Sequence, residues 1–265
     1  MVDPRLVQTF ASHVRAAKSV LFVTGAGISA DSGLPTYRGV GGLYDRATVD
    51  EGVPIEVALS GAMMEMAPGL CWKYIAQIEI ACRGAQPNAA HEIIAKLQRR
   101  FDRSCVLTQN VDGFHRAAGS NDVIEIHGNI GQLHCTQCAW ETVVEDYAGL
   151  QSSLGTSEAP RAPACPECGQ LVRPRVVLFG EMLPTRAVER LSAELQRGFD
   201  LVVSIGTTSA FPYIAEPVVL ARKRGATTIE INPGRTEVSD IVDLHIPARA
   251  KPTFEALWAA LDSDA

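Results

Sequence analysis

Two Cys-x-x-Cys pairs constrain the fold of this chain more than any other feature of its sequence. Cys135 and Cys138 form the first pair, Cys165 and Cys168 form the second, and residues 139–164 separate them. Two such pairs can place four thiolates tetrahedrally around Zn²⁺. The segment between them is small and polar, so the metal would supply much of its folding energy. Because four cysteines fill every coordination position, the sequence predicts a structural zinc and not a catalytic one.

The remaining cysteine usage favours a metal site over disulfides. The chain has seven cysteines, an odd number, and reducing conditions disfavour disulfides. Cys71, Cys82 and Cys105 lie in apolar segments and are expected in the core. Two unrelated redox pairs are the alternative interpretation of the Cys-x-x-Cys motifs. The sequence shows no secretory or membrane-spanning apolar run, so we expect a cytoplasmic protein.

The composition allows a sizeable core and disfavours some partners. Hydrophobic residues make up 46% of the 265 residues, and the formal net charge is -6. A chain of this kind can bury a core. Its acidic balance argues against nucleic-acid binding, because phosphate contacts usually need a basic face. No membrane partner is expected, and nothing in the sequence requires more than a monomer.

Short apolar runs alternate with helical patterns along most of the chain. The expected strands are residues 19–24, 104–108, 122–127, 199–205, 226–231 and 242–246. The expected helices are residues 5–18, 54–82 with a break at Pro68 and Gly69, 88–100, 112–118, 184–197, 211–224 and 252–261. This alternation predicts an α/β fold with a Rossmann-like, mostly parallel sheet that carries helices on both faces.

One polar segment interrupts this rhythm. Residues 131–174 hold both cysteine pairs, and we predict that they form a small inserted zinc-binding module. The surrounding residues 1–130 and 175–265 are then a Rossmann-like nucleotide-binding domain, which also carries a helical insertion at about residues 40–85.

A glycine-rich loop follows the first expected strand. Its stretch from Gly25 to Ala30 lies where a parallel α/β fold receives the pyrophosphate of a dinucleotide. The acidic ribose partner common in such folds is not evident. The loop continues through polar residues 31–39, which predicts that it folds over the ligand. A flexible surface loop is the alternative.

Polar side chains follow the second and third expected strands. Gln109, Asn110 and Asp112 follow the second strand, and His127 ends the third. Carboxyl ends of parallel strands line one crevice, so we expect these side chains in one pocket with the glycine loop. His127 is the candidate general base, because histidine titrates near neutral pH. The alternatives are a core histidine at 127 and an N-cap role for Asp112. The other histidines are expected to be structural or on the surface: His13, His91, His115, His134 and His245.

Together these segments make the sequence resemble the sirtuin family of NAD-dependent protein deacylases. The matching segments are GAGISADSGLPTYR at 25–38, QPNAAH at 86–91, TQNVDGFH at 108–115, IEIHGN at 124–129, RPRVVLFGE at 173–181, IGTTS at 205–209 and INPG at 231–234. The cysteine pairs fall between the fourth and fifth of these, where that family carries its zinc module. The resemblance spans residues 19–261.

The resemblance implies that NAD lies across the glycine loop and is consumed as a co-substrate. At the nicotinamide end it implies phosphate and ribose contacts from Gly25, Ala26, Gly27 and Ser29, a ribose contact from Gln109, and carboxamide contacts from Asn110 and Asp112. Arg38 would close the loop, and the ring of Tyr37 would shield the reactive ribose. At the other end it implies phosphate or adenine-ribose contacts from Gly206, Thr207 and Thr208, and adenosine contacts from Asn232, Pro233, Gly234 and Ala248. Two positions depart from the family, which usually has phenylalanine at Tyr37 and often has serine at Thr208.

The resemblance also implies a protein substrate that carries an acyl-lysine. Its peptide would pair as a strand with residues 177–181, contacting Val177, Phe179, Gly180 and Glu181. The acyl oxygen would attack C1′ of the ribose and expel nicotinamide, and His127 would act as general base on a ribose hydroxyl. The products would be free lysine, nicotinamide and O-acyl-ADP-ribose.

One departure bears on the acyl group. Members that remove succinyl and malonyl groups carry Tyr-x-x-Arg, whereas this chain has Tyr74 and Gln77 in that pattern. Glutamine cannot neutralise a carboxylate, so we expect acetyl or other neutral acyl groups as substrates. A shifted register in which Lys73 or Arg83 supplies the charge is the alternative.

Other functional classes remain open at this point. A mono-ADP-ribosyltransferase shares the nicotinamide-releasing step but leaves acyl-lysine untouched. A non-enzymatic zinc ribbon that binds nucleic acid or a partner protein would need a basic, aromatic-rich insertion, whereas residues 131–174 hold five acidic residues and only two arginines. A dehydrogenase would need a hydride site, for which the sequence shows no pattern.

Overall fold

A six-stranded parallel sheet forms the centre of the larger lobe. The computed structural model describes residues 2–34, 52–156 and 159–262, and in it the sheet has the order β3-β2-β1-β7-β8-β9. The order reverses between β1 and β7, the point at which open α/β sheets bind ligands. All six expected strands are confirmed, with ends that differ by at most two residues: β1 (Ser19–Thr24), β2 (Arg103–Thr108), β3 (Val123–Glu125), β7 (Leu201–Ile205), β8 (Thr227–Ile231) and β9 (Leu244–Ile246).

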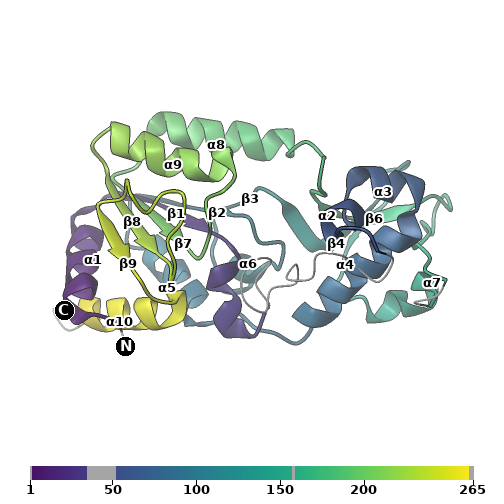
Figure 1. Ribbon diagram of the computed structural model, residues 1–265, viewed down its shortest axis with the longest axis horizontal. Coiled ribbons are helices and arrows are strands. Elements are labelled where there is room, and N and C mark those ends of the chain that lie inside the picture. Colours follow the sequence, from purple (N-terminus) through teal and green to yellow (C-terminus); the bar gives the residue numbers. More distant parts are fainter. Residues whose placement is uncertain (1, 35–51, 157–158, 263–265) are drawn as a thin grey trace.

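Helices cover both faces of this sheet (Figure 1). The side chains of Val20 and Phe22 on β1 point into one apolar cluster, and those of Leu21 and Val23 point into a second. A strand that is buried on both faces has a nearly continuous apolar sequence, as residues 19–24 do. The first cluster packs under α1 (Pro4–Ala16), α5 (Ala89–Gln98) and α10 (Ala250–Asp262), and the second under α8 (Thr185–Arg197) and α9 (Pro212–Lys223).

Local signals set several helix ends. The Asp3 side chain caps α1 by accepting a backbone N–H at 2.8 Å. Asn88 caps α5 in the same way at 2.9 Å. The helix expected at residues 112–118 is only α6 (Phe114–Ala117), because Gly113 before it has a φ of 74°.

A small lobe is built from two separate parts of the chain. Its antiparallel sheet has the order β5-β4-β6. The helical stretch expected at residues 54–82 is three helices, because Ser60 caps the second and Pro68 begins the third. The elements of the lobe are α2 (Ile55–Ala58), α3 (Gly61–Met66), α4 (Pro68–Cys82), β4 (Gly128–Cys135), β5 (Glu141–Val143), α7 (Gln151–Leu154) and β6 (Val172–Val176).

The helices and the cysteine-bearing sheet of this lobe share one core. The Trp72 and Tyr147 rings lie 5.4 Å apart, and both side chains are buried. The indole N–H of Trp72 donates to the Val172 carbonyl at 2.8 Å. The two insertions, which are far apart in sequence, therefore pack as a single body beside the larger lobe (Figure 1).

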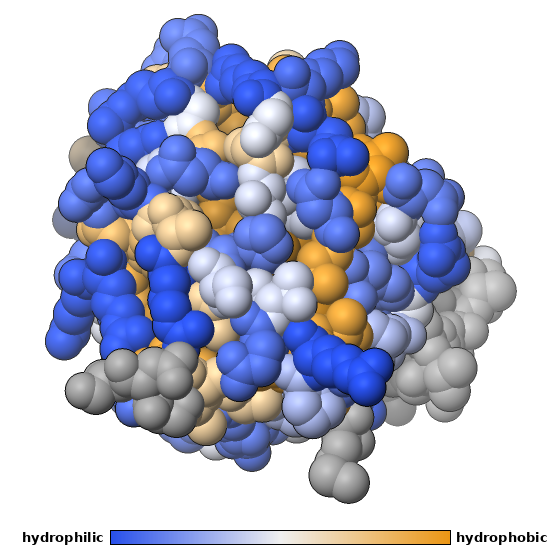
Figure 2. Space-filling view, turned by 90° about the vertical axis from the view of Figure 1, so that its left-hand side faces the viewer, coloured by the Kyte–Doolittle hydropathy of each residue, from blue (hydrophilic) through white to orange (hydrophobic). Residues whose placement is uncertain are grey.

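The surface of the larger lobe is mostly polar where Figure 2 shows it. Hydrophilic side chains cover most of this end of the molecule, and apolar side chains show between them only in limited patches. Among the described residues, no helix has both the length and the apolar character needed to cross a membrane.

Candidate active site between the two lobes

The glycine loop packs directly against the turn that follows β7. The Gly27 N–H donates to the Gly206 carbonyl at 2.8 Å. A Cβ on Gly27 would lie 2.6 Å from the Gly206 Cα, and Gly206 itself has a φ of 57°. Both positions therefore require glycine. The close approach places two short 3₁₀ turns, Ala26–Ile28 and Ala30–Ser32, at the reversal point of the sheet.

Asn110 lies at the centre of a hydrogen-bond network beneath this loop. Its amide N–H groups donate to the Gly25 carbonyl at 3.1 Å and to the Ser29 hydroxyl at 3.2 Å. Ser29 in turn donates to Asp112 at 2.8 Å. The Asn110 side-chain oxygen is buried and has no partner among the described residues. Such an acceptor fits the amide N–H of a ligand, because buried polar groups are otherwise paired.

Asp112 supports both the loop and the next helix. Its carboxylate accepts hydrogen bonds from the Ser29 hydroxyl and, at 3.0 Å, from the Phe114 N–H. Asp112 therefore caps the start of α6 and also lies in the pocket. Burial raises the pKa of the Asp112 carboxyl, against the effect of these two donors.

Two buried histidines contact the glycine loop and the end of β1, and the sequence analysis assigned neither of them a function. His115 contacts the Thr24 hydroxyl at 2.9 Å, and His91 contacts the Ser29 hydroxyl at 3.5 Å. Burial lowers the pKa of His91 to about 4 and that of His115 well below its usual range. Both rings are therefore neutral at pH 7. The sequence signal that could have placed His91 is the capping box at the start of α5, in which the His91 ring accepts the Asn88 N–H.

His127 lies where the chain passes from β3 into β4. Its Nδ1 contacts the Gln109 carbonyl at 3.0 Å, and its Nε2 contacts the Tyr213 hydroxyl at 2.7 Å. Burial lowers the pKa of His127, and the Gln109 carbonyl opposes that shift. The next residue, Gly128, has a φ of 82°, and a Cβ there would lie 1.8 Å from the Arg175 carbonyl. The glycine thus lets β6 pack against the strand that begins beside His127.

The residues expected at the adenosine end lie beside the β7 turn. The Gln109 side chain donates to the Thr207 hydroxyl at 2.7 Å, and the Asn232 side chain donates to the Thr207 carbonyl at 3.0 Å. Ala248 is half-buried and packs against the first apolar cluster. Thr208, Pro233 and Gly234 are exposed. Tyr37 and Arg38 lie outside the described residues.

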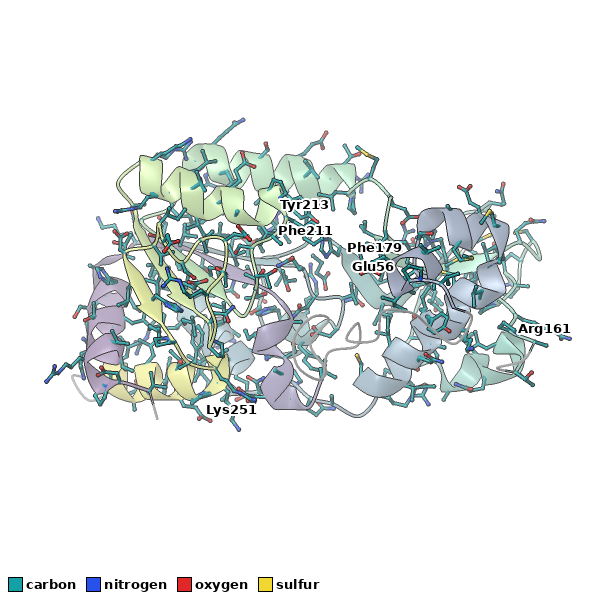
Figure 3. The ribbon with its side chains drawn as sticks, viewed as in Figure 1. Glu56, Arg161, Phe179, Phe211, Tyr213 and Lys251 are labelled. Atoms are coloured by element: carbon teal, nitrogen blue, oxygen red, sulfur yellow. The ribbon has the colours of Figure 1, made fainter. Side chains whose placement is uncertain are left out.

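The segment expected to pair with a peptide lies at the junction of the lobes. The Val177 N–H donates to the His127 carbonyl at 2.9 Å. Phe179 donates to the Leu59 carbonyl at 2.9 Å and accepts from the Gly61 N–H at 3.0 Å, so one edge of the segment is already paired. A peptide strand can add only along the opposite edge, where Gly180 is exposed. In Figure 3, Phe179 lies on the small-lobe side of the junction, and Phe211 and Tyr213 lie on the side of the larger lobe.

Glu181 is held inside the small lobe. Arg173 donates to its two carboxylate oxygens at 2.7 and 2.9 Å, and the Leu178 N–H donates at 2.9 Å. Burial would raise the pKa of Glu181, but these hydrogen bonds outweigh it and lower the pKa. On α4, the Tyr74 side chain is buried in the core of the small lobe, whereas Gln77 is exposed.

The four cysteines of the two pairs come together at the end of β4. Their sulfur atoms lie within 4.8 Å of one another, with 3.4 Å between Cys135 and Cys168 and 3.6 Å between Cys138 and Cys165. A tetrahedron with Zn–S distances of about 2.3 Å has edges of about 3.8 Å, so this donor set fits Zn²⁺. The length of β4 puts the cluster roughly 25 Å along the chain from His127, too far for a direct part in chemistry there.

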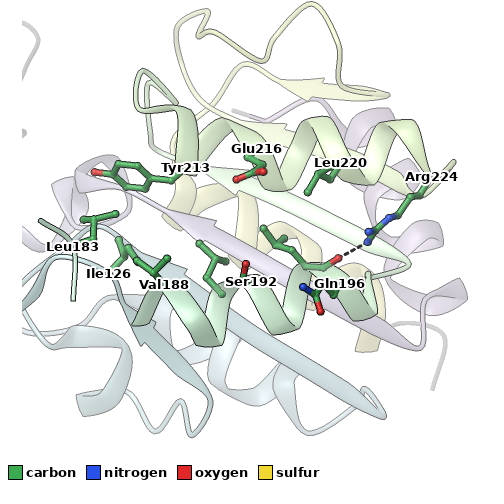
Figure 4. A pocket seen from close by; sticks show the side chains of 11 residues that line it. Ile126, Leu183, Val188, Ser192, Gln196, Tyr213, Glu216, Leu220 and Arg224 are labelled. Atoms are coloured by element: carbon green, nitrogen blue, oxygen red, sulfur yellow. Dashed lines mark hydrogen bonds between the residues drawn. The ribbon is translucent and has the colours of Figure 1, made fainter. Parts of the chain in front are cut away.

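A hollow of about 250 Å³ lies between α8 and α9. Its lining is mainly apolar and includes Leu183, Leu191 and Leu195, together with the polar residues Ser192 and Glu216. Tyr213 lies at one end of the hollow (Figure 4), and its hydroxyl contacts His127. Sequence reasoning identified neither the hollow nor Tyr213.

Known proteins are similar to this chain in sequence. A family model described as the Sir2 family matches residues 25–211. The NAD-dependent protein deacylase 2 of Pseudomonas aeruginosa is 50% identical over 246 residues, which cover 92% of this chain and 93% of that protein. Its namesake from Pseudomonas syringae pv. tomato is 53% identical over 242 residues, which cover 91% and 94%.

Solved structures agree with the sequence relatives. A Sir2 homolog–NAD complex has a TM-score of 0.80 at 33% identity and covers 100% of this chain and 96% of its own. A Sir2 complex with a deacetylated p53 peptide and 3′-O-acetyl ADP ribose has a TM-score of 0.83 at 27% identity, with coverage of 96% and 97%.

Proposed function

The chain belongs to the Sir2 family, and on that premise we propose that it removes acyl groups from lysine side chains of proteins in an NAD-consuming reaction. The products are deacylated lysine, nicotinamide and O-acyl-ADP-ribose. The observation that carries the proposal is the neutral, half-buried His127 at the junction of the lobes. Gln109 contacts His127 through its carbonyl and Thr207 through its side chain, so it connects the candidate base to the β7 turn that would help to hold NAD.

The residues of the larger lobe fit NAD. The backbone contact between Gly27 and Gly206 leaves no side chain between the loop and the β7 turn, which suits a pyrophosphate. The orphaned oxygen of Asn110 suits the carboxamide N–H of nicotinamide, and Asp112 supports it through Ser29. Asn232 and the exposed residues after it suit the adenosine. When bound, NAD supplies the ribose C1′ that takes the acyl oxygen as nicotinamide leaves.

His127 would accept the proton of a ribose hydroxyl at Nε2. Its Nδ1–H stays on the Gln109 carbonyl, so the imidazolium that forms remains hydrogen-bonded. The acyl-lysine peptide would add to the open edge of residues 177–181, between the lobes. Zn²⁺ would hold the small lobe together through the four cysteines and take no part in the reaction.

Replacing Gly27 by alanine is expected to weaken NAD binding about 5- to 150-fold, because a clash of this kind costs about 1–3 kcal/mol. The new Cβ would meet the Gly206 backbone at 2.6 Å, where no flexible side chain can yield. Calorimetric titration of NAD measures the change. Gly149→Ala is the matched control, because nothing lies within 4 Å of a Cβ at that position. Equal NAD affinity in Gly27→Ala and wild type would contradict the placement of the dinucleotide.

Acetyl-lysine peptide is expected to react faster than succinyl-lysine peptide. The helix α4 carries Gln77 where a carboxylate-binding arginine would be needed, and an unpaired carboxylate is costly to bury. Parallel rates on the two peptides, with NAD saturating, decide this. Gln77→Arg is expected to raise the succinyl rate relative to the acetyl rate. Faster removal of succinyl than of acetyl by the wild type would reverse our assignment of the acyl group.

A further inference from the structure

The hydrogen bonds of His127 fix which of its nitrogens is basic. The Gln109 carbonyl can only accept, so the nitrogen that faces it at 3.0 Å, Nδ1, carries the proton. In the neutral ring, Nε2 is then the lone-pair nitrogen. The Tyr213 hydroxyl lies 2.7 Å from Nε2 and therefore donates to it. Burial raises the pKa of Tyr213, so its hydroxyl stays protonated at neutral pH.

Packing holds Tyr213 in this position. It is the second residue of α9, after Pro212, and the carbonyl of the preceding Phe211 accepts from Ile214 at 2.9 Å. The Tyr213 and Phe211 rings stack at 5.5 Å with an interplanar angle of 15°. The imidazole of His127 stands edge-on to both rings, at 5.9 and 6.1 Å. The two ring nitrogens of His127 are thus held by hydrogen bonds, and one side of the ring is held by aromatic contacts.

The electrostatic surroundings of the ring are uncharged. Its two hydrogen-bond partners in the described chain are a carbonyl and a phenol, and the stacked pair on α9 is aromatic. Glu125, two residues before His127 at the end of β3, is paired with Arg116 at 2.9 Å and accepts from Asn129. The tyrosine hydroxyl is therefore the one side-chain donor to the basic nitrogen among the described residues.

We propose that Tyr213 is a positioning residue for the His127 base: its hydroxyl orients Nε2 in the ligand-free protein and yields that nitrogen to a ribose hydroxyl when NAD binds. The role as a base rests on the proposed function. In the step that follows, the ribose O–H bond breaks, an Nε2–H bond forms, and Nδ1–H remains on Gln109. Tyr213 lines one part of the hollow between α8 and α9 (Figure 4). The phenol ring of Tyr213 therefore has open space beside it into which it can turn.

Nuclear magnetic resonance of ¹⁵N-histidine in the ligand-free protein tests the positioning role directly. The wild type is expected to show the Nδ1–H tautomer at His127. Tyr213→Phe removes a donor that favours the neutral ring, so the His127 pKa should rise by about 0.5–1 unit, the equivalent of one hydrogen bond. Tyr147→Phe is the matched control, because its hydroxyl donates to the Ile130 carbonyl in the core of the small lobe. It should leave the His127 pKa unchanged.

Kinetics provide the second readout. In Tyr213→Phe, kcat/KM for NAD at pH 6 should fall about 3- to 10-fold. The acid limb of its pH profile should move to higher pH by about 0.5–1 unit, because kcat/KM reports the pKa values of the free enzyme. The value of kcat at pH 8 should change less than about two-fold, since Tyr213 has left Nε2 in the complex. An unchanged His127 pKa, or an unchanged acid limb, would overturn the role of Tyr213. A wild type without NAD-dependent deacylation would instead overturn the proposed function.

Discussion

Replacing Cys135 by alanine is expected to release zinc, unfold the small lobe and abolish deacylation. Cys135 is 5% exposed and belongs to the core that joins α4 to β4 and β6. Its sulfur accepts the Gln137 and Cys138 N–H groups at 3.3 and 3.4 Å, the geometry that presents a thiolate to a metal. Structural zinc sites contribute about 10–16 kcal/mol of apparent binding free energy to folding, which is as large as the whole stability of a typical domain.

Zinc content, hydrogen exchange in β4 to β6 and activity measure this effect together. Cys82→Ala is the matched control, because Cys82 is only partly buried and lies outside the cluster. It should keep the metal and at least most of the activity. A Cys135→Ala protein that lacks zinc yet keeps a protected small lobe and full activity would show that the metal has no structural role.

Replacing His127 by alanine is expected to lower the deacylation rate about 10²- to 10⁴-fold, the usual contribution of a positioned general base. The fold should change little, because His127 is half-buried and, in the part of the chain that the structure describes, its hydrogen bonds and aromatic contacts are with Gln109, Phe211 and Tyr213. Steady-state nicotinamide release on an acetyl-lysine peptide should fall in parallel, since turnover waits on the base. The thermal midpoint should stay near that of the wild type.

His13→Ala is the control for this variant, because His13 lies in the last turn of α1, away from the junction of the lobes. It should retain wild-type rates. Near wild-type nicotinamide release by His127→Ala would refute the assignment of the base.

The sequence was most informative where the signal is local. The apolar runs of the parallel sheet, the Asn88 cap and the two cysteine pairs depend on short spacings, and each predicted its element correctly. The sheet order then brings Asn110 and the glycine loop together, as the rule for strand ends requires.

The sequence was least informative where distant segments meet. Tyr213 follows His127 by 86 residues, and no spacing rule connects them. The shared core of α4 and the cysteine-bearing sheet likewise depends on Trp72 reaching Val172. The roles of His91 and His115 depend on burial beneath a loop, which a single sequence does not reveal. The pairing of Phe179 with Leu59 is also non-local, and it reduces the expected peptide site to one edge.

Product analysis of one reaction tests the central claim most directly. The purified chain is incubated with NAD and an acetyl-lysine peptide, and all products are identified by mass spectrometry. We predict deacetylated peptide, nicotinamide and O-acetyl-ADP-ribose in equal amounts. A peptide that keeps its acetyl group and gains ADP-ribose, or deacetylation without consumption of NAD, would contradict the account.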